Sequence, residues 1–233
     1  MRNLKKLLAL VLAMMMALSL MVTANAANPV RDYPDIDQAD EAFEEAIDVL
    51  TGMKVYSGDN GNFKPASTIT RAEVAALIYR LATGDVDDSQ AGLYAIYGNF
   101  PDVPHDAWYA GYVGYCANAG YIKGRPNGNF DPSGNVTGYE ALAMILRAIG
   151  YDKNGEFTGA TWQTEVSALS QQLGILDNVK TTQYGGTLYL AARRDVVADL
   201  LFQADAYVPM VVYTPAFGYQ PYGMVNGSSG NLI

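Results

Sequence analysis

An internal repeat is the feature that most restricts how this chain can fold. Landmarks near its start recur at a constant offset of 67 residues: Asp35 with Asp102, Gly61-Asn62-Phe63 with Gly128-Asn129-Phe130, Pro65 with Pro132, and Thr70 and Glu73 with Thr137 and Glu140. A third, less regular copy follows, in which Trp162 and Gly174 match Trp108 and Gly120 at an offset of 54, and Asp195 matches Glu140 at 55. Landmarks that share one offset define repeated structural units, so the fold must be built from related copies.

Each copy has the pattern helix, Gly-rich loop, helix. The apolar spacing predicts first helices near 40–50, 108–119 and 165–173, and second helices that begin near Thr70, Thr137 and Arg193. One helix pair of this size cannot bury its apolar stripe, whereas three pairs packed together can. We therefore expect an all-α domain over 27–207, with three helix-loop-helix repeats (about 30–84, 98–151 and 155–207) in a pseudo-three-fold bundle.

The stretch TITRAEVAALIYRL at 68–81 shows how a second helix begins. Thr70 followed three residues later by Glu73 is a capping box, in which each side chain satisfies a backbone donor of the other residue. The first turn of a helix favours acids because its free N–H groups carry partial positive charge. Arg71 stands in that turn, and the pattern gives it no role in folding.

The two ends of the chain differ from the repeats. Residues 1–26 have a basic start, an apolar run and a small-x-small site at Ala24-Asn25-Ala26, which predicts a secretory signal peptide and a mature protein without membrane attachment. The segment 208–233 has β-type residues, prolines and glycines and no charged residue. We expect this tail to be irregular or β-prone, and to be either a linker or the start of a further domain.

Composition excludes several classes of function. Loss of Arg2, Lys5 and Lys6 with the signal peptide changes the net charge from −9 to −12, which argues against nucleic-acid binding. The single cysteine, Cys116, rules out an intramolecular disulfide, and with His105 as the only histidine zinc ligands are scarce. We expect no metal, no cofactor and no catalytic residues.

The order of motifs resembles the S-layer homology (SLH) repeat. Those motifs are an aromatic-x-Asp opening, a Trp near the start of the first helix, Gly-aliphatic-x-Gly, an N-G-x-F loop with Pro, and ITRAE at 69–73. The resemblance implies three repeats with grooves between them that bind secondary cell-wall polysaccharides carrying pyruvylated sugars, or a peptidoglycan-associated glycan. It also implies a secreted, non-catalytic protein that is held at the cell wall or S-layer.

Eight residues are candidates for contact with such a ligand. An acidic ketal requires a fork-shaped cationic donor, and Arg at a helix N-terminus would add to the free N–H groups there. The candidates are Arg71 and Arg193 for the carboxylate, Asp35 and Asp102 for sugar hydroxyls, Trp108 and Trp162 for apolar sugar faces, and Lys123 and Arg125 as further cations. Copy two has Gly138 where copy one has Arg71, so we expect one or two working grooves.

Other interpretations stay open for some of these residues and for the function. The two tryptophans are equally suited to packing between copies, and the two aspartates to capping a short segment. A glycan hydrolase with paired carboxylates is one alternative function. A self-assembling lattice protein, whose tail adds a strand to a neighbouring molecule, is another.

Overall fold

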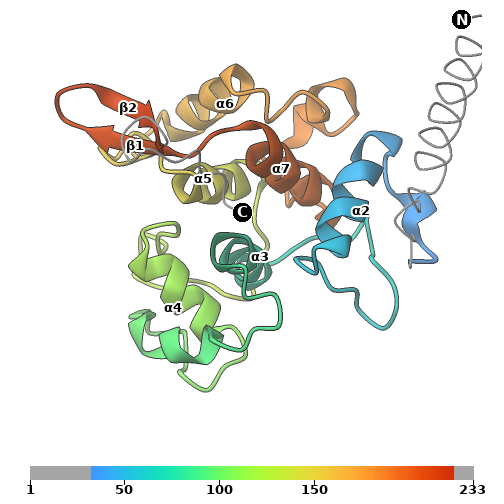
Figure 1. Ribbon diagram of the computed structural model, residues 1–233, viewed down its shortest axis with the longest axis horizontal. Helices are drawn as coiled ribbons and strands as arrows, with labels where there is room; N and C mark the ends of the chain where they lie inside the picture. Colours follow the sequence, from blue (N-terminus) through green and yellow to red (C-terminus); the bar gives the residue numbers. More distant parts are fainter. Residues whose placement is uncertain (1–32, 223–233) are drawn as a thin grey trace, which may run out of the picture. The chain divides into compact units, whose positions relative to one another are not determined.

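The computed structural model describes residues 33–222, which fall within one compact unit, Tyr33–Ile233 (Figure 1). The predicted signal peptide and residues 223–233 lie outside the described residues. The α-helices and strands within them are α2 (Glu44–Gly52), α3 (Arg71–Thr83), α4 (Ala110–Asn118), α5 (Gly138–Ala148), α6 (Trp162–Gln172), α7 (Arg194–Tyr207), β1 (Val211–Thr214) and β2 (Gly218–Pro221). Short 3-10 helices cover Ile36–Gln38, Glu41–Phe43, Ala91–Tyr97, Val179–Thr181 and Gly185–Thr187.

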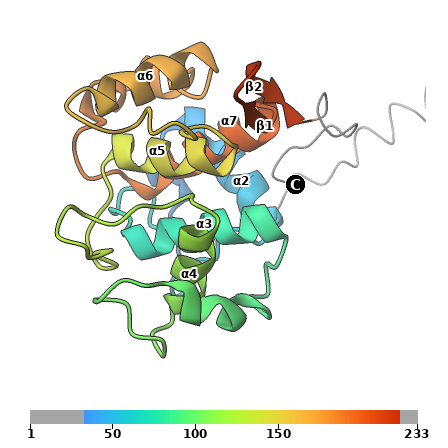
Figure 2. The same cartoon turned by 90° about the vertical axis from the view of Figure 1, so that its left-hand side faces the viewer.

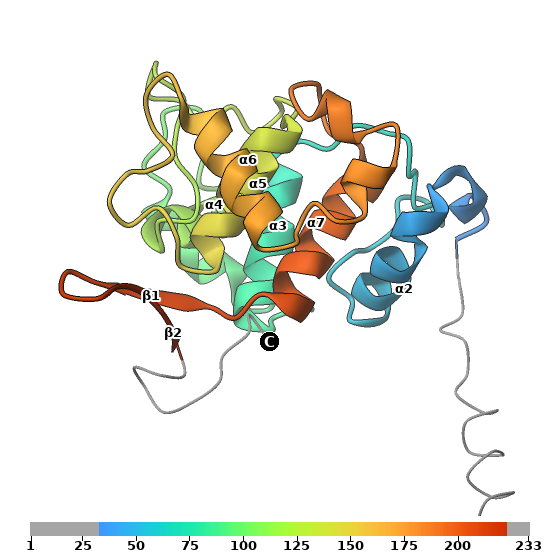
Figure 3. The same ribbon diagram turned by 90° about the horizontal axis from the view of Figure 1, so that it is seen from above.

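The predicted helix pairs are present, as α2 with α3, α4 with α5, and α6 with α7. The second helices α3, α5 and α7 lie at the centre, and the first helices surround them (Figures 1 and 3). The expectation of a mostly helical domain with a β-prone tail is confirmed, because β1 and β2 form a small antiparallel sheet after the last helix.

The starts of the second helices are fixed by caps where the sequence provides them. Thr70 and Glu73 form the predicted reciprocal capping box, and Thr137 and Glu140 form the same arrangement at α5. At α7 the N-cap is Arg193, whose side chain makes no capping bond. The third copy is therefore offset by 56 residues from the second at this point. The predicted match of Asp195 with Glu140 is wrong by one residue.

The segments that lead into the three second helices meet in a closed ring of backbone hydrogen bonds. The N–H of Ile69 donates to the carbonyl of Ala192 (3.2 Å), that of Ala192 to Val136 (2.8 Å), and that of Val136 to Ile69 (3.1 Å). All three residues are buried. Because each one directly precedes an N-cap residue, the ring places the starts of α3, α5 and α7 around one point.

The first N–H groups of these helices are used in contacts between copies. In α3, the N–H of Arg71 donates to Gly134 (2.9 Å) and that of Ala72 to Pro132 (3.1 Å). In α7, the N–H of Arg194 donates to Ser67 at 2.9 Å. The expectation that the start of α3 offers free N–H groups to an anion is therefore wrong, since loop carbonyls of the next copy already accept from its first two residues.

The β-hairpin packs against the end of α5, near α6 (Figure 2). The N–H of Val211 donates to the carbonyl of Ile149 at 2.9 Å. A Cβ atom on Gly150 would lie 2.0 Å from the carbonyl oxygen of Val211, and its φ is +108°, so only glycine allows this approach. Among the described residues, we find no helix of the length and apolarity needed to cross a bilayer.

Candidate functional site

Arg71 joins the first copy to the second. Its side chain is buried; Nε donates to the carbonyl of Phe130 at 2.7 Å and Nη2 to that of Lys123 at 2.9 Å. The guanidinium carbon lies 4.7 Å from the centre of the Phe130 ring, a cation–π contact. Burial, with Arg125 nearby, lowers the pKa of Arg71. The prediction that Arg71 has no role in folding is wrong, because it binds two carbonyls of the next copy.

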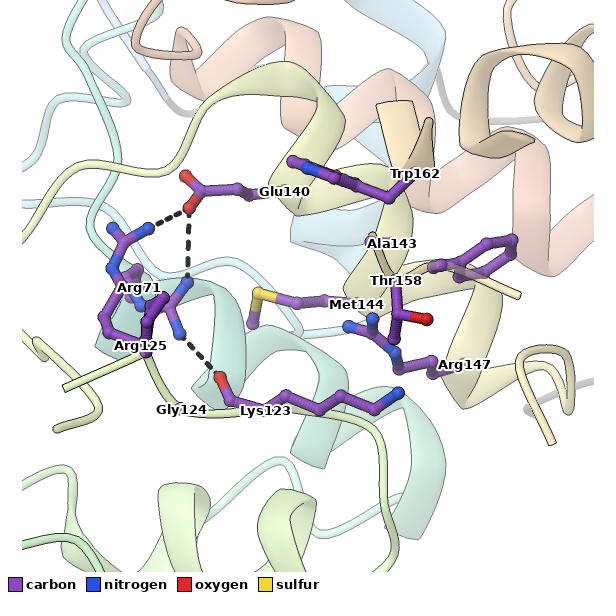
Figure 4. Close-up of a pocket in the computed structure, with 12 residues that line it drawn as sticks. Arg71, Lys123, Gly124, Arg125, Glu140, Ala143, Met144, Arg147, Thr158 and Trp162 are labelled. Atoms are coloured by element: carbon purple, nitrogen blue, oxygen red, sulfur yellow. Dashed lines mark hydrogen bonds and ion pairs between the residues drawn. The ribbon is translucent and has the colours of Figure 1, made fainter. Parts of the chain in front are cut away.

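A groove of about 380 Å³ opens beside Arg71, and we call it the cationic groove (Figure 4). The loop after α4, the inner face of α5 and the start of α6 form its walls. It is lined by Arg71, Lys123, Gly124, Arg125, Pro126, Glu140, Ala143, Met144, Arg147, Phe157, Thr158 and Trp162. Four of these side chains are basic and one is acidic, although the whole chain is strongly acidic.

Glu140 links the helix cap to the groove. One carboxylate oxygen, Oε2, accepts the N–H of Thr137 at 2.9 Å and completes the capping box. The other, Oε1, accepts from Arg125 and lies 3.7 Å from Nη1 of Arg71 (Figure 4). The cap that starts α5 therefore also holds two cations along one wall of the groove.

Asp152 performs a similar task on the opposite wall. Its fully buried carboxylate accepts from Lys123 Nζ at 2.7 Å, from Arg147 Nε at 2.6 Å and from the N–H of Phe157 at 2.8 Å. Burial alone would raise the pKa of Asp152, but these three donors outweigh it and lower the pKa. The carboxylate is thus held in its charged form, and it fixes the two cations.

Arg147 is the groove cation with the most unused donor capacity. Only its Nε has a hydrogen-bond partner among the described residues; Nη1 and Nη2 have none. The side chain is 10% exposed, beside Thr158 and Met144 in the groove (Figure 4). Two parallel N–H donors of this kind match a carboxylate. Arg147 was not among the residues predicted from the sequence, although it lies 67 residues after Arg80 and thus at the repeat offset.

A second groove, of about 220 Å³, has the same parts with different charges, and we call it the balanced groove. It is lined by Tyr56, Ser57, Gly58, Asp59, Ile69, Glu73, Ala76, Leu77, Arg80, Trp108 and Arg194. Arg194 takes the place of Arg71, since its Nε donates to the carbonyl of Phe63 at 2.9 Å and its Nη1 lies 3.4 Å from Glu73. Arg80 binds both oxygens of Asp88, at 2.9 and 2.6 Å.

The third junction, between copies two and three, carries neither the arginine nor the glutamate. Gly138 begins α5 where Arg71 and Arg194 begin their helices, and Val196 stands where Glu73 and Glu140 do. A Cβ atom on Gly138 would lie 2.6 Å from the side chain of Leu188. A mainly apolar groove of about 360 Å³ adjoins this contact.

The predicted site residues fall into separate places. Arg71, Lys123, Arg125 and Trp162 line the cationic groove together, and Trp108, 62% exposed, lines the balanced groove. Arg193 lines the apolar groove, and its fork is already bound to Asp195, with Nε–Oδ1 at 3.0 Å and Nη2–Oδ2 at 2.5 Å. Of the two neighbouring arginines, it is therefore Arg194 and not Arg193 that makes the contacts equivalent to those of Arg71.

The two predicted aspartates lie in neither the cationic nor the balanced groove. Asp35 accepts the N–H groups of Phe63 and Lys64, each at 2.8 Å. Asp102 does the same for Phe130 and Asp131, at 2.8 and 2.7 Å. Both carboxylates tie the opening of a copy to its own loop, and this geometry favours a structural role over contact with sugar hydroxyls.

Comparison with known proteins agrees with the sequence motifs. The model of the S-layer homology domain matches residues 32–75 and 99–142. The chain is 31% identical over 188 residues to a surface layer protein of Brevibacillus choshinensis, a match covering 79% of this chain and 16% of that protein. A middle cell wall protein of Brevibacillus brevis is 30% identical over 209 residues, with 86% and 19% covered.

A cell surface protein of Thermoanaerobacter kivui is 29% identical over 215 residues, with 91% of this chain and 26% of that protein covered. This chain therefore spans between 16% and 26% of the length of these three relatives. None of the three has an enzyme's name. By the family matches, the chain carries two S-layer homology domains, one in each of its first two helix-pair copies.

Proposed function

We propose that this chain is a non-catalytic anchoring module, which holds a secreted protein at the bacterial cell wall by binding an acidic wall polysaccharide in the cationic groove. The single observation that carries the proposal is the guanidinium of Arg147, whose two terminal nitrogens have no hydrogen-bond partner among the described residues. The domain matches and the surface-protein relatives support a role at the cell surface.

The chemistry of the groove suits a sugar that carries a carboxylate, such as a pyruvate ketal. Arg147 offers a two-pronged donor, and the ammonium of Lys123, whose side chain is 46% exposed, adds charge beside it. Trp162 provides an aromatic surface in the same groove. Because Asp152 and Glu140 already fix the cations, little side-chain freedom would be lost on binding.

The arrangement of the copies supports the same proposal. We infer that the third helix pair is a degenerate copy of the repeat, and that the ring of Ile69, Val136 and Ala192 marks a pseudo-three-fold axis. Each junction between copies then has its own groove. Their charges differ, and only the cationic groove has strongly basic walls.

The groove offers little to a glycan hydrolase. Such an enzyme requires one carboxyl group that gives a proton and a second that acts as nucleophile or base. Glu140 already contacts Arg125 and Arg71, and Asp152 binds Lys123 and Arg147. Both acids are thus occupied as partners of the groove cations.

Sedimentation with purified cell walls tests the proposal. The mature protein should pellet with intact walls and stay in solution once acid treatment has stripped the wall polysaccharide. Arg147→Lys, which keeps the charge but loses the fork, should bind at least about tenfold more weakly, since a charged hydrogen bond contributes about 1.5–3 kcal/mol.

Arg80→Lys in the balanced groove is the matched control, because it makes the same change at the equivalent position. It should leave wall binding unchanged. Equal binding to stripped and intact walls would refute the polysaccharide as ligand. Equal losses for the two variants would refute the cationic groove as the site.

A further inference from the structure

The β-hairpin after the last repeat completes a further pocket, distinct from the three grooves at the junctions between copies. The O–H of Tyr219, on β2, donates to Oε1 of Glu156 at 2.6 Å, and the N–H of Lys153 donates to the Tyr219 oxygen at 2.9 Å. The Tyr219 ring lies 5.0 Å from the ring of Tyr151. The hairpin is thus fastened to the loop before α6, with its tyrosine as one wall of a pocket.

This pocket, which we call the aromatic cup, has a volume of about 260 Å³. Tyr151, Phe157 and Tyr219 provide its aromatic lining, and Glu165 and Gln172 of α6 also line it. Glu165 and Gln172 are solvent-exposed, and among the described residues neither side chain has a hydrogen-bond or ion-pair partner. The cup therefore combines ring surfaces with an unused carboxylate and an unused amide.

We propose that the aromatic cup is a saccharide subsite for an uncharged sugar of the same wall polysaccharide. This proposal rests on the proposed function. Ring faces pack against the C–H face of a pyranose, while carboxylate and amide groups bind its hydroxyls. The lining of the cup includes acids but no Lys or Arg, so an acidic sugar is disfavoured there.

The cup and the cationic groove lie next to each other. Phe157 lines both, and Asp152, a wall of the cup, also binds the groove cations Lys123 and Arg147. Trp162 in the groove and Gln172 in the cup are ten residues apart on α6, about 15 Å along the helix. One polysaccharide chain can therefore occupy both pockets, with its acidic sugar in the groove and a neutral sugar in the cup.

The contact also gives the tail a function within this module. The tail has no charged residue, and its hairpin is held by backbone hydrogen bonds between β1 and β2 and by the Tyr219 contacts. Without Tyr219, the cup would lose one of its aromatic walls. The hairpin thus extends the binding surface beyond the repeats.

Calorimetry with size-fractionated oligosaccharides, released from purified cell walls, tests this inference. The double variant Glu165→Ala/Gln172→Ala removes the polar wall, and both residues are exposed on α6, so folding should be unaffected. We expect its affinity for the longer fraction to fall about tenfold, and its affinity for the shortest acidic fraction to be unchanged. Gln171→Ala, exposed next to Gln172 but outside the cup, is the control and should behave as the unsubstituted protein.

Different results separate the two proposals. If the double variant binds the longer fraction as tightly as the unsubstituted protein does, the cup proposal is overturned and the anchoring function stands. Equal losses for both fractions would also overturn it, because the effect would then not depend on ligand length. If the unsubstituted protein binds neither fraction, both proposals are wrong.

Discussion

The cationic groove and the balanced groove are built from the same parts, yet they offer a ligand different charges. In each, an arginine that begins one helix binds a loop of the next copy, and a capping glutamate faces that arginine. The corresponding pairs are Arg71 and Arg194, Glu140 and Glu73, Arg147 and Arg80, and Trp162 and Trp108. The two grooves differ in the loop that lines them. Lys123 and Arg125 of the cationic groove correspond to Ser57 and Asp59 of the balanced groove.

The comparison distinguishes arginines that join two copies of the repeat from an arginine that is available to bind a ligand. Arg71 and Arg194 have the same task, since each donates to a phenylalanine carbonyl of the next copy and stacks on that ring. Arg147 and Arg80 do not, because Asp88 takes both prongs of Arg80, whereas Asp152 takes only Nε of Arg147. The placement of one loop aspartate thus decides whether a guanidinium is available to a ligand.

The largest expected effect tests the fastening role that the two grooves share. Arg71→Ala and Arg194→Ala should each lower the free energy of unfolding by about 3 kcal/mol, because each removes a guanidinium that donates to a phenylalanine carbonyl of the next copy and lies over that phenylalanine ring. Urea denaturation followed by circular dichroism measures this. Lys54→Ala is the control. It removes an ion pair between Lys54 and Asp87 at 3.7 Å, whose side chains are 69% and 78% exposed, and should change the free energy of unfolding by less than about 0.5 kcal/mol.

An unequal result would break the comparison. If Arg194→Ala destabilises the protein and Arg71→Ala does not, the two arginines are not equivalent fasteners. Arg71 would then be held in place mainly for its ligand, as predicted from the sequence.

The next effect concerns how folding stability depends on pH. Asp199 and Asp152 should contribute to this dependence in opposite directions. Asp199 of α7 is fully buried; Oδ1 accepts from Asn178 and Gln203, and Oδ2 has no hydrogen-bond partner among the described residues. Burial raises its pKa from 3.8 to about 6. A carboxyl whose pKa is raised by folding stabilises the fold below its unfolded pKa, and this contribution is lost as the pH rises through 6.

Asp152, beside the cationic groove, has a lowered pKa, so its contribution is present at neutral pH and is lost only below pH 3.8. Between pH 4 and 7 Asp199 should therefore contribute a loss of stability on the order of 3 kcal/mol, and Asp195, whose pKa burial also raises, should add to it in the same direction. The variant Asp199→Asn, measured by urea denaturation across this range, should flatten the profile. An unchanged slope would assign the pH dependence to another group.

A smaller effect tests whether the loop charges decide recognition. Lys123→Ser/Arg125→Asp gives the cationic groove the loop residues of the balanced groove. Arg125 and Asp59 occupy equivalent turns, because the N–H of Arg125 donates to the carbonyl of Asn129 and that of Asp59 to the carbonyl of Asn62. Binding to the wall polysaccharide should weaken by about 2–3 kcal/mol. Calorimetry measures the loss, and one below about threefold would show that Arg147 alone is sufficient.

Local signals were enough to predict the helices but not the role of the arginines. The capping box of Thr70 and Glu73 is a property of four neighbouring residues, and it places the start of α3 correctly. The partners of Arg71 are backbone carbonyls 52 and 59 residues away, and no sequence pattern indicates where a distant carbonyl points. The role of Arg71 in joining two copies could therefore be recognised only from the structure.

Two further differences have identifiable causes. Asp195 is acidic like the capping glutamate, so the sequence aligned the third copy with the second one residue out of register. Arg193 was for this reason chosen as a ligand-binding candidate in place of Arg194. Arg147 was visible through the repeat offset, but its importance depends on which acid reaches it. That acid, Asp152, comes from a loop four residues after the end of α5, where no repeat landmark lies.

The smallest effect belongs to the third junction, where both members of the arginine–glutamate pair are absent together. Gly138 takes the position of the arginine and Val196 that of the glutamate, so neither charge of the pair is left without its partner. Leu188 occupies the space beside Gly138. Gly138→Ala should gain helix propensity but place a Cβ atom 3.0 Å from the backbone of Leu188. The net cost should be about 1 kcal/mol.

Thermal unfolding measures this cost, and Gly92→Ala, where an added Cβ meets nothing within 4 Å, is the matched control. Leu188 is buried, so Leu188→Ala is destabilising by itself, but adding Gly138→Ala to that variant should cost less than adding it to the unsubstituted protein, because the leucine side chain is then absent. If Gly138→Ala instead stabilises the protein, Leu188 can move aside. The third junction would then have room for an arginine, and the missing charge pair would not be explained by packing.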